Sequence, residues 1–569
     1  MSINRGTASY GDQGFSLFLR KAFARHMGHD AEDFEKPVIG IINTKSEINR
    51  CHAHFDSISE AIKRGVLMAG GVPLEFPTIS LGESFTSPTS MLFRNLAAMD
   101  TEEMIRAQPI DGVVLIGGCD KMTPAQLMGA ASADIPSIMV SGGPMRNGQY
   151  EGKTLGACSD CRFFWQEYRS GTITEEELEN INESLAPTSG HCMVMGSAST
   201  MAAAAEAMGM TLPGTAAVPA TENKLLNIAQ KAGQQSVTLV KQQLTPSKLM
   251  TKKAFENAIK MIMAVGGSTN AIIHLIAIAG RLNIKLPLEL FDEIGRETPF
   301  IANLRPAGKY QMEDFYYAGG VQAVIKELEP VFHMEERTVT GNTHAGNLVG
   351  QSFPKNYGEV IYTFDKPLFD GGGIAVLKGN LAPDGAVIKP KAASVNLLKH
   401  KGRAVVFESV EDMEAKVNDP ELDVRADDVL VLKNTGPIGA PGMPEAGMLP
   451  IPKKLLEEGV RDMVRLSDCR MSGTAFGTVV LHVAPEAAAG GPLALVENGD
   501  MIELDVEERR LNLCVEETEL VQRKSRWSSP VKKSARGYTK LYQERVLQAD
   551  KGCDFDFLTG GDLSGADDR

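Results

Sequence analysis

The sequence predicts an α/β protein in which an N-terminal domain built on a parallel sheet is followed by a β-rich, barrel-like domain. From residue 37 to about residue 326, short apolar runs alternate with helical patterns, as in a parallel sheet covered by helices. After about residue 364 the pattern changes to short strands and turns. The length of 569 residues exceeds what one core needs. We therefore expect two domains, at 1–360 and 361–569.

Two strand–helix pairs open the first domain. The apolar run 38–42 precedes a helical pattern at 55–68, and the run 113–116 precedes one at 124–131. Strands that alternate with helices in this way lie parallel in one sheet. Farther along, two stretches rich in Ala, Met and Ile predict buried helices. They span 203–208 and 272–279.

The second domain is predicted from apolar, β-branched runs that are separated by turn residues. A turn is expected at 383–385, where Pro, Asp and Gly follow one another. The segment 330–358 is poor in long apolar runs and is expected to connect the two domains. The predicted strands are 374–377, 405–407, 429–432 and 479–481.

The composition excludes several classes of function. With 58 Lys and Arg against 72 Asp and Glu, the net charge of -14 disfavours binding to nucleic acid or to an anionic membrane. No apolar run reaches the roughly 20 residues of a membrane span, and the first residues lack the apolar core of a signal peptide. Eight cysteines are too few and too scattered for a disulfide framework. We expect a cytoplasmic protein with free thiols and a small-molecule substrate.

The strongest chemical signal is a trio of unlike ligands at a predicted strand end. Cys119, Asp120 and Lys121 follow the apolar run 113–116 and two glycines. Thr-Pro, a favourable helix start, comes soon after. Open parallel sheets bind ligands in the crevice at this edge. A thiolate beside a carboxylate at such a place predicts a metal site.

Two further cysteines lie in comparable loops. Cys51 stands beside His52, and Cys192 precedes an Ala/Met-rich helical run, where amide donors and the positive end of the helix dipole favour a thiolate. Only the fold brings such distant residues together. Spacing alone leaves open whether the three cysteines share one metal, and on the residues alone separate thiols are the better interpretation.

Three other motifs have simpler explanations. Cys158 and Cys161 have redox-type spacing without a thioredoxin-like context, so buried structural thiols are the better interpretation. The run 51–54 has one Cys and two His but no second ligand pair at zinc-finger spacing. The segment 148–154 ends like a phosphate loop but is one residue too short.

Two polar loops interrupt the apolar pattern of the second domain. One loop, at 439–445, is rich in Gly and Pro and carries Glu445. The other, at 467–474, is dense in hydroxyls and charge and carries Ser472 and Thr474. Taken alone, a solvated carboxylate and an ordinary turn explain these loops best.

The ordered set of motifs resembles a known enzyme family. The cysteine loops, Gly-Gly-Ser-Thr-Asn at 266–270 and Arg-Met-Ser-Gly-Thr at 470–474 are similar to the family of dihydroxy-acid dehydratase, 6-phosphogluconate dehydratase and the sugar-acid dehydratases. The resemblance extends from about residue 37 to residue 557. It implies a hydro-lyase that removes water from a 2,3-dihydroxy acid to give a 2-keto-3-deoxy acid, with the active site between the two domains.

The resemblance also implies cofactors and residue roles. A [2Fe–2S] cluster with one open iron position and a Mg²⁺ ion are expected. Lys121 is expected to be carbamylated, because Mg²⁺ prefers oxygen ligands to an ammonium. Ser472 matches the catalytic base, and Thr474 is expected to contact the substrate. The implied cluster ligands are Cys51, Cys119 and Cys192, and the implied magnesium site is Glu83, Asp120, Lys121 and Glu445. A homodimer or homotetramer is also implied.

Details of the motifs favour the sugar-acid branch of that family. Cys-Arg-Met-Ser-Gly-Thr at 469–474 and Glu-Ser-Phe-Thr-Ser-Pro-Thr at 83–89 are similar to this branch, whereas branched-chain enzymes commonly have Gly-Arg-Phe-Ser-Gly. His52 departs from the Asn that relatives often have there. We expect arabinonate, xylonate or gluconate as substrate, with overlap onto 2,3-dihydroxy-isovalerate. The alternatives are a branched-chain dihydroxy-acid dehydratase, a 6-phosphogluconate enzyme with a four-iron cluster, and a catalytically silent binding protein on the same scaffold.

Overall fold

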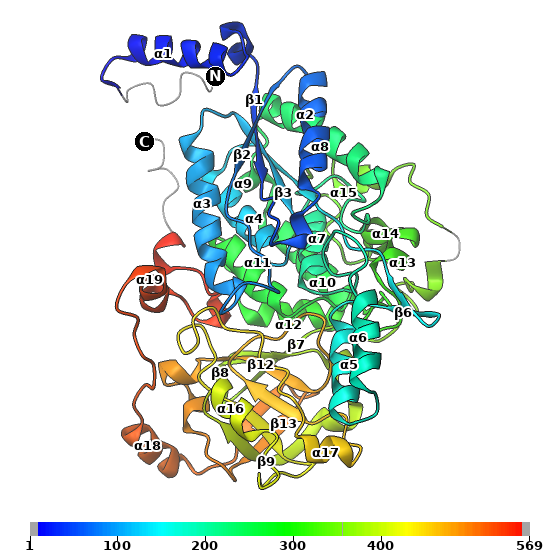
Figure 1. The fold of residues 1–569 in the computed structure, drawn as a ribbon, viewed down its shortest axis with the longest axis vertical. Helices are drawn as coiled ribbons and strands as arrows, with labels where there is room; N and C mark the ends of the chain where they lie inside the picture. The colour runs from blue at the N-terminus through cyan, green and yellow to red at the C-terminus, as the bar shows by residue number, and fades with distance from the viewer. Residues whose placement is uncertain (1–9, 355–356, 560–569) are drawn as a thin grey trace.

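The computed structural model describes residues 10–354 and 357–559. The molecule is elongated, with a parallel sheet and its helices towards one end and a β-barrel at the other (Figure 1). This arrangement confirms the predicted fold class, an α/β region followed by a barrel-like β region.

The N-terminal sheet has four parallel strands. They are β1 (Val38–Asn43), β2 (Val72–Pro77), β3 (Gly112–Gly117) and β4 (Ser137–Ser141), in the order β2-β1-β3-β4. Every residue of β1, β3 and β4 is buried, as expected for parallel strands that are covered on both faces. The edge strand β2 is largely half-exposed.

Helices cover both faces of this sheet (Figure 1). The pairs are α2 (Phe55–Met68) with α8 (Asn223–Gln242), and α3 (Arg94–Ala107) with α4 (Met122–Ala133). Two glycines allow α2 and α8 to touch. A Cβ atom at Gly65 would lie 1.9 Å from the carbonyl oxygen of Gln230, and one at Gly233 would lie 2.2 Å from that of Ile62. Alanine at either position forces these two helices apart.

Beyond β4 the N-terminal region is helical. Within the described ranges, no strand after Ser141 joins the parallel sheet, and only an isolated parallel bridge between Met139 and Thr211 extends it, so the alternation expected up to about residue 326 is wrong beyond β4. Alanine and methionine predominate here, and every residue of α7 is buried because small side chains let helices pack on all sides. The helices are α7 (Ser197–Ala207), α9 (Pro246–Leu249), α10 (Lys252–Ala264), α11 (Asn270–Arg281), α12 (Leu288–Glu297), α13 (Met312–Tyr317), α14 (Gly320–Glu327) and α15 (His344–Leu348).

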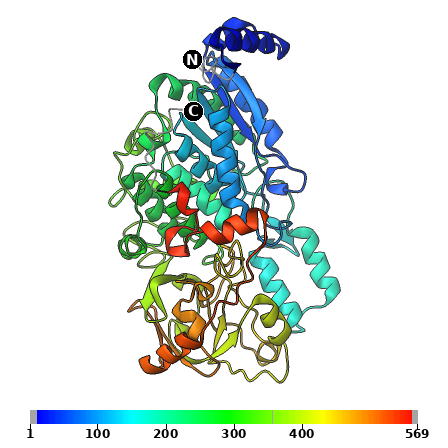
Figure 2. The same ribbon diagram turned by 90° about the vertical axis from the view of Figure 1, so that its left-hand side faces the viewer.

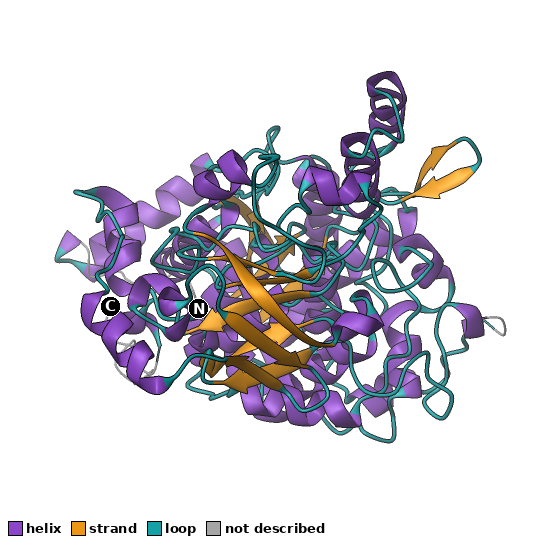
Figure 3. Cartoon of the chain, turned by 90° about the horizontal axis from the view of Figure 1, so that it is seen from below, coloured by secondary structure: helices purple, strands orange, loops and turns teal. Residues whose placement is uncertain are grey.

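A small excursion leaves the N-terminal domain and reaches the barrel (Figures 1 and 3). It consists of β5 (Gly148–Tyr150), β6 (Lys153–Leu155), α5 (Ser159–Arg169) and α6 (Glu175–Ser184). At the end of α5, Arg169 donates to the side chain of Asn418 (2.6 Å) and to the carbonyl oxygen of Ile451 (3.0 Å). The excursion is thus attached to both domains.

The C-terminal strands form a closed barrel. In chain order they are β7 (Ala375–Gly379), β8 (Ala382–Ile388), β9 (Lys399–Phe407), β10 (Val429–Leu432), β11 (Val464–Ser467), β12 (Val479–Ala484), β13 (Met501–Asp505) and β14 (Arg510–Leu513). Their order around the barrel is β10-β11-β12-β8-β7-β14-β13-β9. The four predicted strands are confirmed, but the turn expected at 383–385 is wrong, because these residues lie within β8. Helices α16 (Val410–Lys416), α17 (Lys453–Glu457) and α18 (Glu517–Arg526) lie outside it.

The chain finally returns to the N-terminal domain. Residues 537–559, which include α19 (Gly537–Arg545), pack beside α3 (Figure 2). Arg94 donates to the carbonyl oxygens of Gly552 and Cys553, both at 2.9 Å, and Arg281 pairs with Asp554 at 2.6 Å. The terminal segment therefore links the barrel to the helices of the other domain. The helix α1 (Gln13–His26) projects from the end of the molecule that lies away from the barrel (Figure 1). No helix within the described ranges has the length and apolar character of a membrane span.

Candidate active site

A cavity of about 300 Å³ lies between the two domains and collects the residues that the sequence motifs singled out. From the N-terminal domain it is lined by Cys51, Glu83, Cys119, Asp120 and Cys192. From the C-terminal domain it is lined by Glu445, Ser472 and Thr474. Lys121 lies directly behind the carboxylates and is fully buried. Residues that are hundreds of positions apart in the sequence therefore meet at one place.

The carboxyl ends of the parallel strands position the N-terminal half of the site. Cys51 follows β1 in a short 3₁₀ helix (Arg50–His52), Glu83 follows β2, and Cys119 to Lys121 follow β3. The loop of Cys192 is tied to the loop after β4, because His191 N–H donates to Gly143 O (3.1 Å). All four strands thus contribute at the edge where parallel sheets bind ligands.

His52 joins two of the cysteine loops. Its Nε2 accepts the N–H of Cys119 at 3.0 Å, so the ring proton is on Nδ1, which donates to the carbonyl oxygen of Thr44 at 2.9 Å. The ring stacks on Phe55, and burial lowers its pKa to about 3. A neutral histidine at this position fixes Cys51 relative to Cys119.

Three carboxylates surround the ammonium of Lys121. Oxygen atoms of Glu83, Asp120 and Glu445 lie within 4.8 Å of one another. Lys121 Nζ lies 2.5 Å from Asp120, 3.2 Å from Glu83 and 3.6 Å from Glu445. Burial alone lowers the pKa of Lys121, but the carboxylates of Asp120 and Glu83 outweigh it and raise that pKa. Burial likewise raises the pKa of Glu83, and Lys121 with Arg470 brings it down to about 2.

A network of buried donors holds Glu445, and the sequence alone did not identify it. Arg470 Nη1 and Asn270 Nδ2 each donate to Glu445 Oε1 at 2.9 Å. Asn270 Nδ2 also donates to Ser197 Oγ (3.0 Å), while Arg470 Nε donates to Met443 O (2.7 Å). Asn270 and Arg470 belong to the motifs at 266–270 and 470–474. These motifs are recognisable in the sequence, but the sequence does not show that they hold Glu445.

The loop that carries Ser472 packs against Ser197 and Ser268 of the N-terminal domain. Ser472 Oγ lies 2.8 Å from Thr474 Oγ1, and both side chains face the cavity. A Cβ atom at Gly473 would lie 2.6 Å from Ser268 Cβ and 2.7 Å from the backbone nitrogen of Ser197. Glycine is therefore required at position 473 for the two domains to approach each other here.

Cys158 and Cys161 lie in the same cavity. Both thiols are half-buried, so the expectation that they are fully buried is wrong. Cys158 Sγ lies 3.4 Å from Cys192 Sγ. The excursion with α5 brings this pair to the site, an arrangement that sequence spacing did not indicate.

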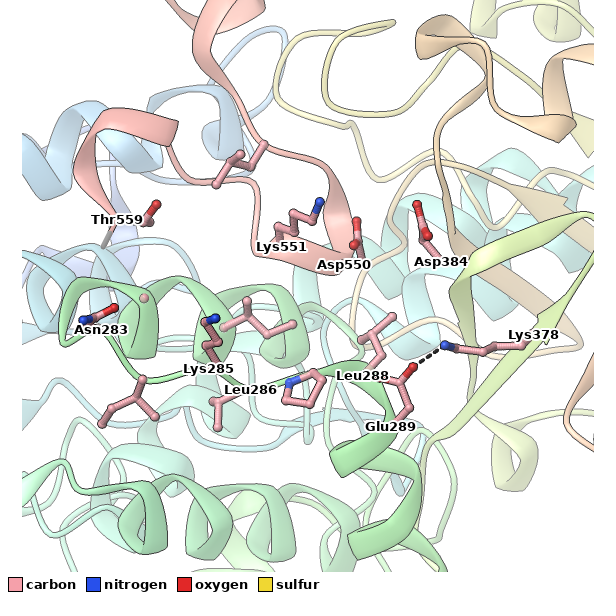
Figure 4. Close-up of a pocket in the computed structure, with 15 residues that line it drawn as sticks. Asn283, Lys285, Leu286, Leu288, Glu289, Lys378, Asp384, Asp550, Lys551 and Thr559 are labelled. Carbon is pink, nitrogen blue, oxygen red and sulfur yellow. Dashed lines mark hydrogen bonds and ion pairs between the residues drawn. The ribbon is translucent and has the colours of Figure 1, made fainter. Parts of the chain in front are cut away.

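A larger cavity, of about 580 Å³, lies elsewhere and lacks this chemistry. It lies between α11 to α12 and the returning terminal segment (Figure 4). Lys378 pairs with Glu289 there, and Lys285 and Asp550 also line the wall. Among its described lining residues there is neither a cysteine nor a converging group of carboxylates. The smaller cavity is therefore the candidate active site.

Comparison with known proteins gives the family. The profile described as "Dihydroxy-acid/6-phosphogluconate dehydratase N-terminal" matches residues 36–347, and its C-terminal counterpart matches residues 359–553. The chain belongs to the dihydroxy-acid/6-phosphogluconate dehydratase family. It is therefore a dehydratase, a carbon–oxygen lyase that acts on dihydroxy acids.

Three relatives of this dehydratase match over nearly the full length. The L-arabinonate dehydratase of Rhizobium leguminosarum bv. trifolii (strain WSM2304) is 49% identical, over 97% of this chain and 95% of the relative. The L-arabonate dehydratase of Azospirillum brasilense is 49% identical, over 98% and 97%. The 6-deoxy-6-sulfo-D-gluconate dehydratase of Pseudomonas putida is 46% identical, over 96% and 94%.

Proposed function

We propose that this dehydratase acts on a sugar acid, removing water from C2 and C3 to give a 2-keto-3-deoxy acid. One observation carries the proposal: five thiols, three carboxylates and Ser472 line a single cavity between the two domains. The names of these three relatives, two L-arabinonate (L-arabonate) dehydratases and a 6-deoxy-6-sulfo-D-gluconate dehydratase, support a sugar acid over a branched-chain dihydroxy acid.

Cys51, Cys119 and Cys192 would hold the iron–sulfur cluster, in the two-iron form. Their thiols line one cavity, and the neighbouring Cys51 thiol together with burial raises the pKa of the Cys119 thiol. Bound iron reverses this effect, because metals bind the thiolate form. When bound, the cluster supplies a Lewis acid for the 3-hydroxyl group that leaves.

Glu83, Asp120 and Glu445 would hold the magnesium ion, since their hard oxygen donors are the ligands that Mg²⁺ prefers. The ammonium of Lys121 now lies where it competes with that cation for the same carboxylates. Carbamylation of Lys121 replaces the ammonium by a carboxylate-like group and turns a competitor into a ligand. When bound, the ion supplies positive charge next to the substrate carboxylate and 2-hydroxyl group.

The side chains of the barrel domain perform the proton transfer in this proposal. Ser472 removes the proton from C2, and Thr474, at 2.8 Å, orients the serine hydroxyl and contacts the substrate. A free serine hydroxyl is a very weak acid, so it acts as a base only beside concentrated positive charge. Arg470 and Asn270 orient Glu445 at the same wall. The enol that forms then tautomerises to the keto acid.

A substrate panel on anaerobically purified protein tests this function. We expect brown protein that contains iron and sulfide and converts L-arabinonate, D-xylonate or D-gluconate to a product that reacts with semicarbazide. Turnover by colourless, iron-free protein would contradict the proposed site, and absence of turnover on every acid of the panel would support a silent binding protein.

The same panel separates the other family functions. Preference for 2,3-dihydroxy-isovalerate would indicate the branched-chain enzyme, and preference for 6-phosphogluconate the phosphorylated branch. Mössbauer spectroscopy distinguishes a two-iron from a four-iron cluster. A cytoplasmic location and a homodimer or homotetramer complete the proposal, and light scattering after size exclusion measures the oligomeric state.

A further inference from the structure

The distance between Cys158 and Cys192 is that of two ligands of one metal. Their sulfur atoms are 3.4 Å apart. Disulfide sulfurs lie about 2.05 Å apart. A tetrahedral metal with metal–sulfur bonds of about 2.3 Å holds two thiolates roughly 3.8 Å apart. The Cys158–Cys192 distance is closer to the second arrangement, and both side chains line the active-site cavity.

Cys158 is held in place by an unusual backbone conformation. It is the residue before α5 and has φ +73° and ψ -38°, which non-glycine residues rarely adopt. Asp160 fixes the turn, because its Oδ2 accepts the N–H of Gly156 at 2.6 Å and an N–H of Arg305 at 2.5 Å. The segment therefore keeps the Cys158 thiol close to Cys192.

Cys161 differs from Cys158, although it lies one helical turn away. Its Sγ accepts the backbone N–H of Cys158 at 3.1 Å and contacts the Cys158 thiol, whereas it is Cys158 whose sulfur lies 3.4 Å from that of Cys192. Of the thiol contacts in the cavity, two join cysteines from different loops: Cys51 with Cys119, and Cys158 with Cys192. Four cysteines in two pairs form the usual ligand set of a two-iron cluster.

We propose that Cys158 is a fourth cysteine ligand of the cluster in the substrate-free enzyme, at the iron position that the other three cysteines leave open. This inference rests on the proposed function. The Cys158 thiol releases its proton to solvent when it binds iron. The 3-hydroxyl group of the substrate would take its place, and the released thiolate would take up a proton from solvent. No electron is transferred in either step.

The exchange protects the cluster between turnovers. With three cysteine ligands, one iron of the cluster would be open to water and oxygen, whereas Cys158 would complete its set of ligands. Substrate binding then both displaces the thiolate and covers the iron. The iron position would therefore be free for the 3-hydroxyl group only when substrate is bound.

Spectroscopy of cluster-loaded variants tests this assignment. Cys158→Ser is compared with the wild-type protein and with Cys161→Ser, the matched control one turn away. All three are loaded anaerobically, checked for iron and sulfide content, and checked for folding by far-UV circular dichroism. The readouts are visible circular dichroism and resonance Raman of the Fe–S(Cys) stretches, with and without the best acid of the substrate panel.

We expect Cys158→Ser to lose one Fe–S(Cys) band in the substrate-free state, while Cys161→Ser resembles the wild type. Saturating substrate should change the wild-type spectrum towards that of Cys158→Ser. In air, the cluster of Cys158→Ser should bleach several-fold faster. A fully loaded Cys158→Ser protein with the wild-type spectrum would overturn the assignment and leave the dehydratase proposal intact. Failure of the wild-type protein to bind any cluster would overturn both.

Discussion

Arg470 and Glu445 form a buried ion pair at 2.9 Å, in which the guanidinium fixes the one carboxylate that the barrel domain contributes to the acidic group. Arg470 is fully buried and also donates to Thr89 Oγ1, at 3.2 Å, in the loop that follows Glu83. One side chain therefore orients acidic residues from both domains. The acidic group exists only when the domains are docked.

Replacement of Arg470 by Lys should weaken metal binding more than folding. Lysine keeps the charge but lacks the planar fork that contacts Glu445, Met443 and Thr89 together. We expect Mg²⁺ affinity and turnover to fall about 10- to 100-fold. Magnesium titration of the activity measures the change, and an unaltered visible spectrum of the cluster serves as control. Unchanged magnesium dependence would contradict the role of this residue.

Ser472→Ala should abolish turnover while the cofactors stay bound. Loss of a positioned base typically lowers a rate by about 10²- to 10⁴-fold. Iron content and the visible spectrum should match those of the wild type, because Ser472 is not among the thiol or carboxylate ligands. Thr474→Val should have a smaller effect that appears in both kcat and KM. Equal activity of Ser472→Ala and wild type would remove the serine from the mechanism.

The buried pair of Arg281 and Asp554 should anchor the returning terminal segment. Both side chains are fully buried, with Nε and Oδ2 at 2.6 Å. Asp554→Asn leaves the guanidinium with Glu102, at 3.1 Å, as its charge partner and should cost about 3 kcal/mol of unfolding free energy in urea denaturation. The matched control is Asp556→Asn, whose partner Arg545 is half-exposed, and its cost should stay below about 1 kcal/mol. Similar losses of unfolding free energy in both variants would contradict the anchoring role of the Arg281–Asp554 pair.

His344 should make the protein sensitive to acid. Burial lowers the pKa of this histidine from 6.5 to about 4, so the unfolded chain binds the proton more readily than the folded one. Its contribution to stability is complete above pH 6.5 and is lost as the pH falls towards 4. Between pH 7 and pH 5 the wild type should lose about 2 kcal/mol through this residue alone. His344→Gln should lack that part of the slope, and urea denaturation at the two pH values measures it. An identical slope in both proteins would exclude the effect.

Chelation should separate the two cofactors. Because Glu83, Asp120 and Glu445 are oxygen donors and the cluster ligands are thiols, EDTA should remove magnesium and stop turnover without bleaching the visible spectrum. Added Mg²⁺ should restore activity. Loss of colour in parallel with activity would indicate that the two sites depend on each other.

Local patterns predicted much of the fold, and long-range contacts supplied the rest. The runs at 38–42 and 429–432 become strands and the pattern at 55–68 becomes α2, because their periodicity already matches these elements. The expected turn at 383–385 fails because pairing within the closed barrel extends β8 across it. The domain boundary near residue 360 stays a prediction.

The candidate site was predictable in its residues but not in its contacts. Cys119 and its neighbours were visible because unlike ligands at a strand end have few other uses. The supporting roles of Asn270 and Arg470 depend on contacts across 175 and 25 positions of the chain, which no spacing indicates. Cys158 was misjudged for the same reason, since only the turn before α5 brings it to Cys192.

The placement of Gly473 between Ser197 and Ser268 has a further consequence for how the enzyme matures. All the proposed cluster ligands precede residue 193, whereas the hydroxyl proposed to transfer the proton belongs to the barrel, which is synthesised afterwards. Iron capture and reactivity are thus assigned to different halves of the polypeptide. We expect a nascent chain that ends before the barrel to carry Cys51, Cys119 and Cys192 but to stay inactive until Ser472 is in place.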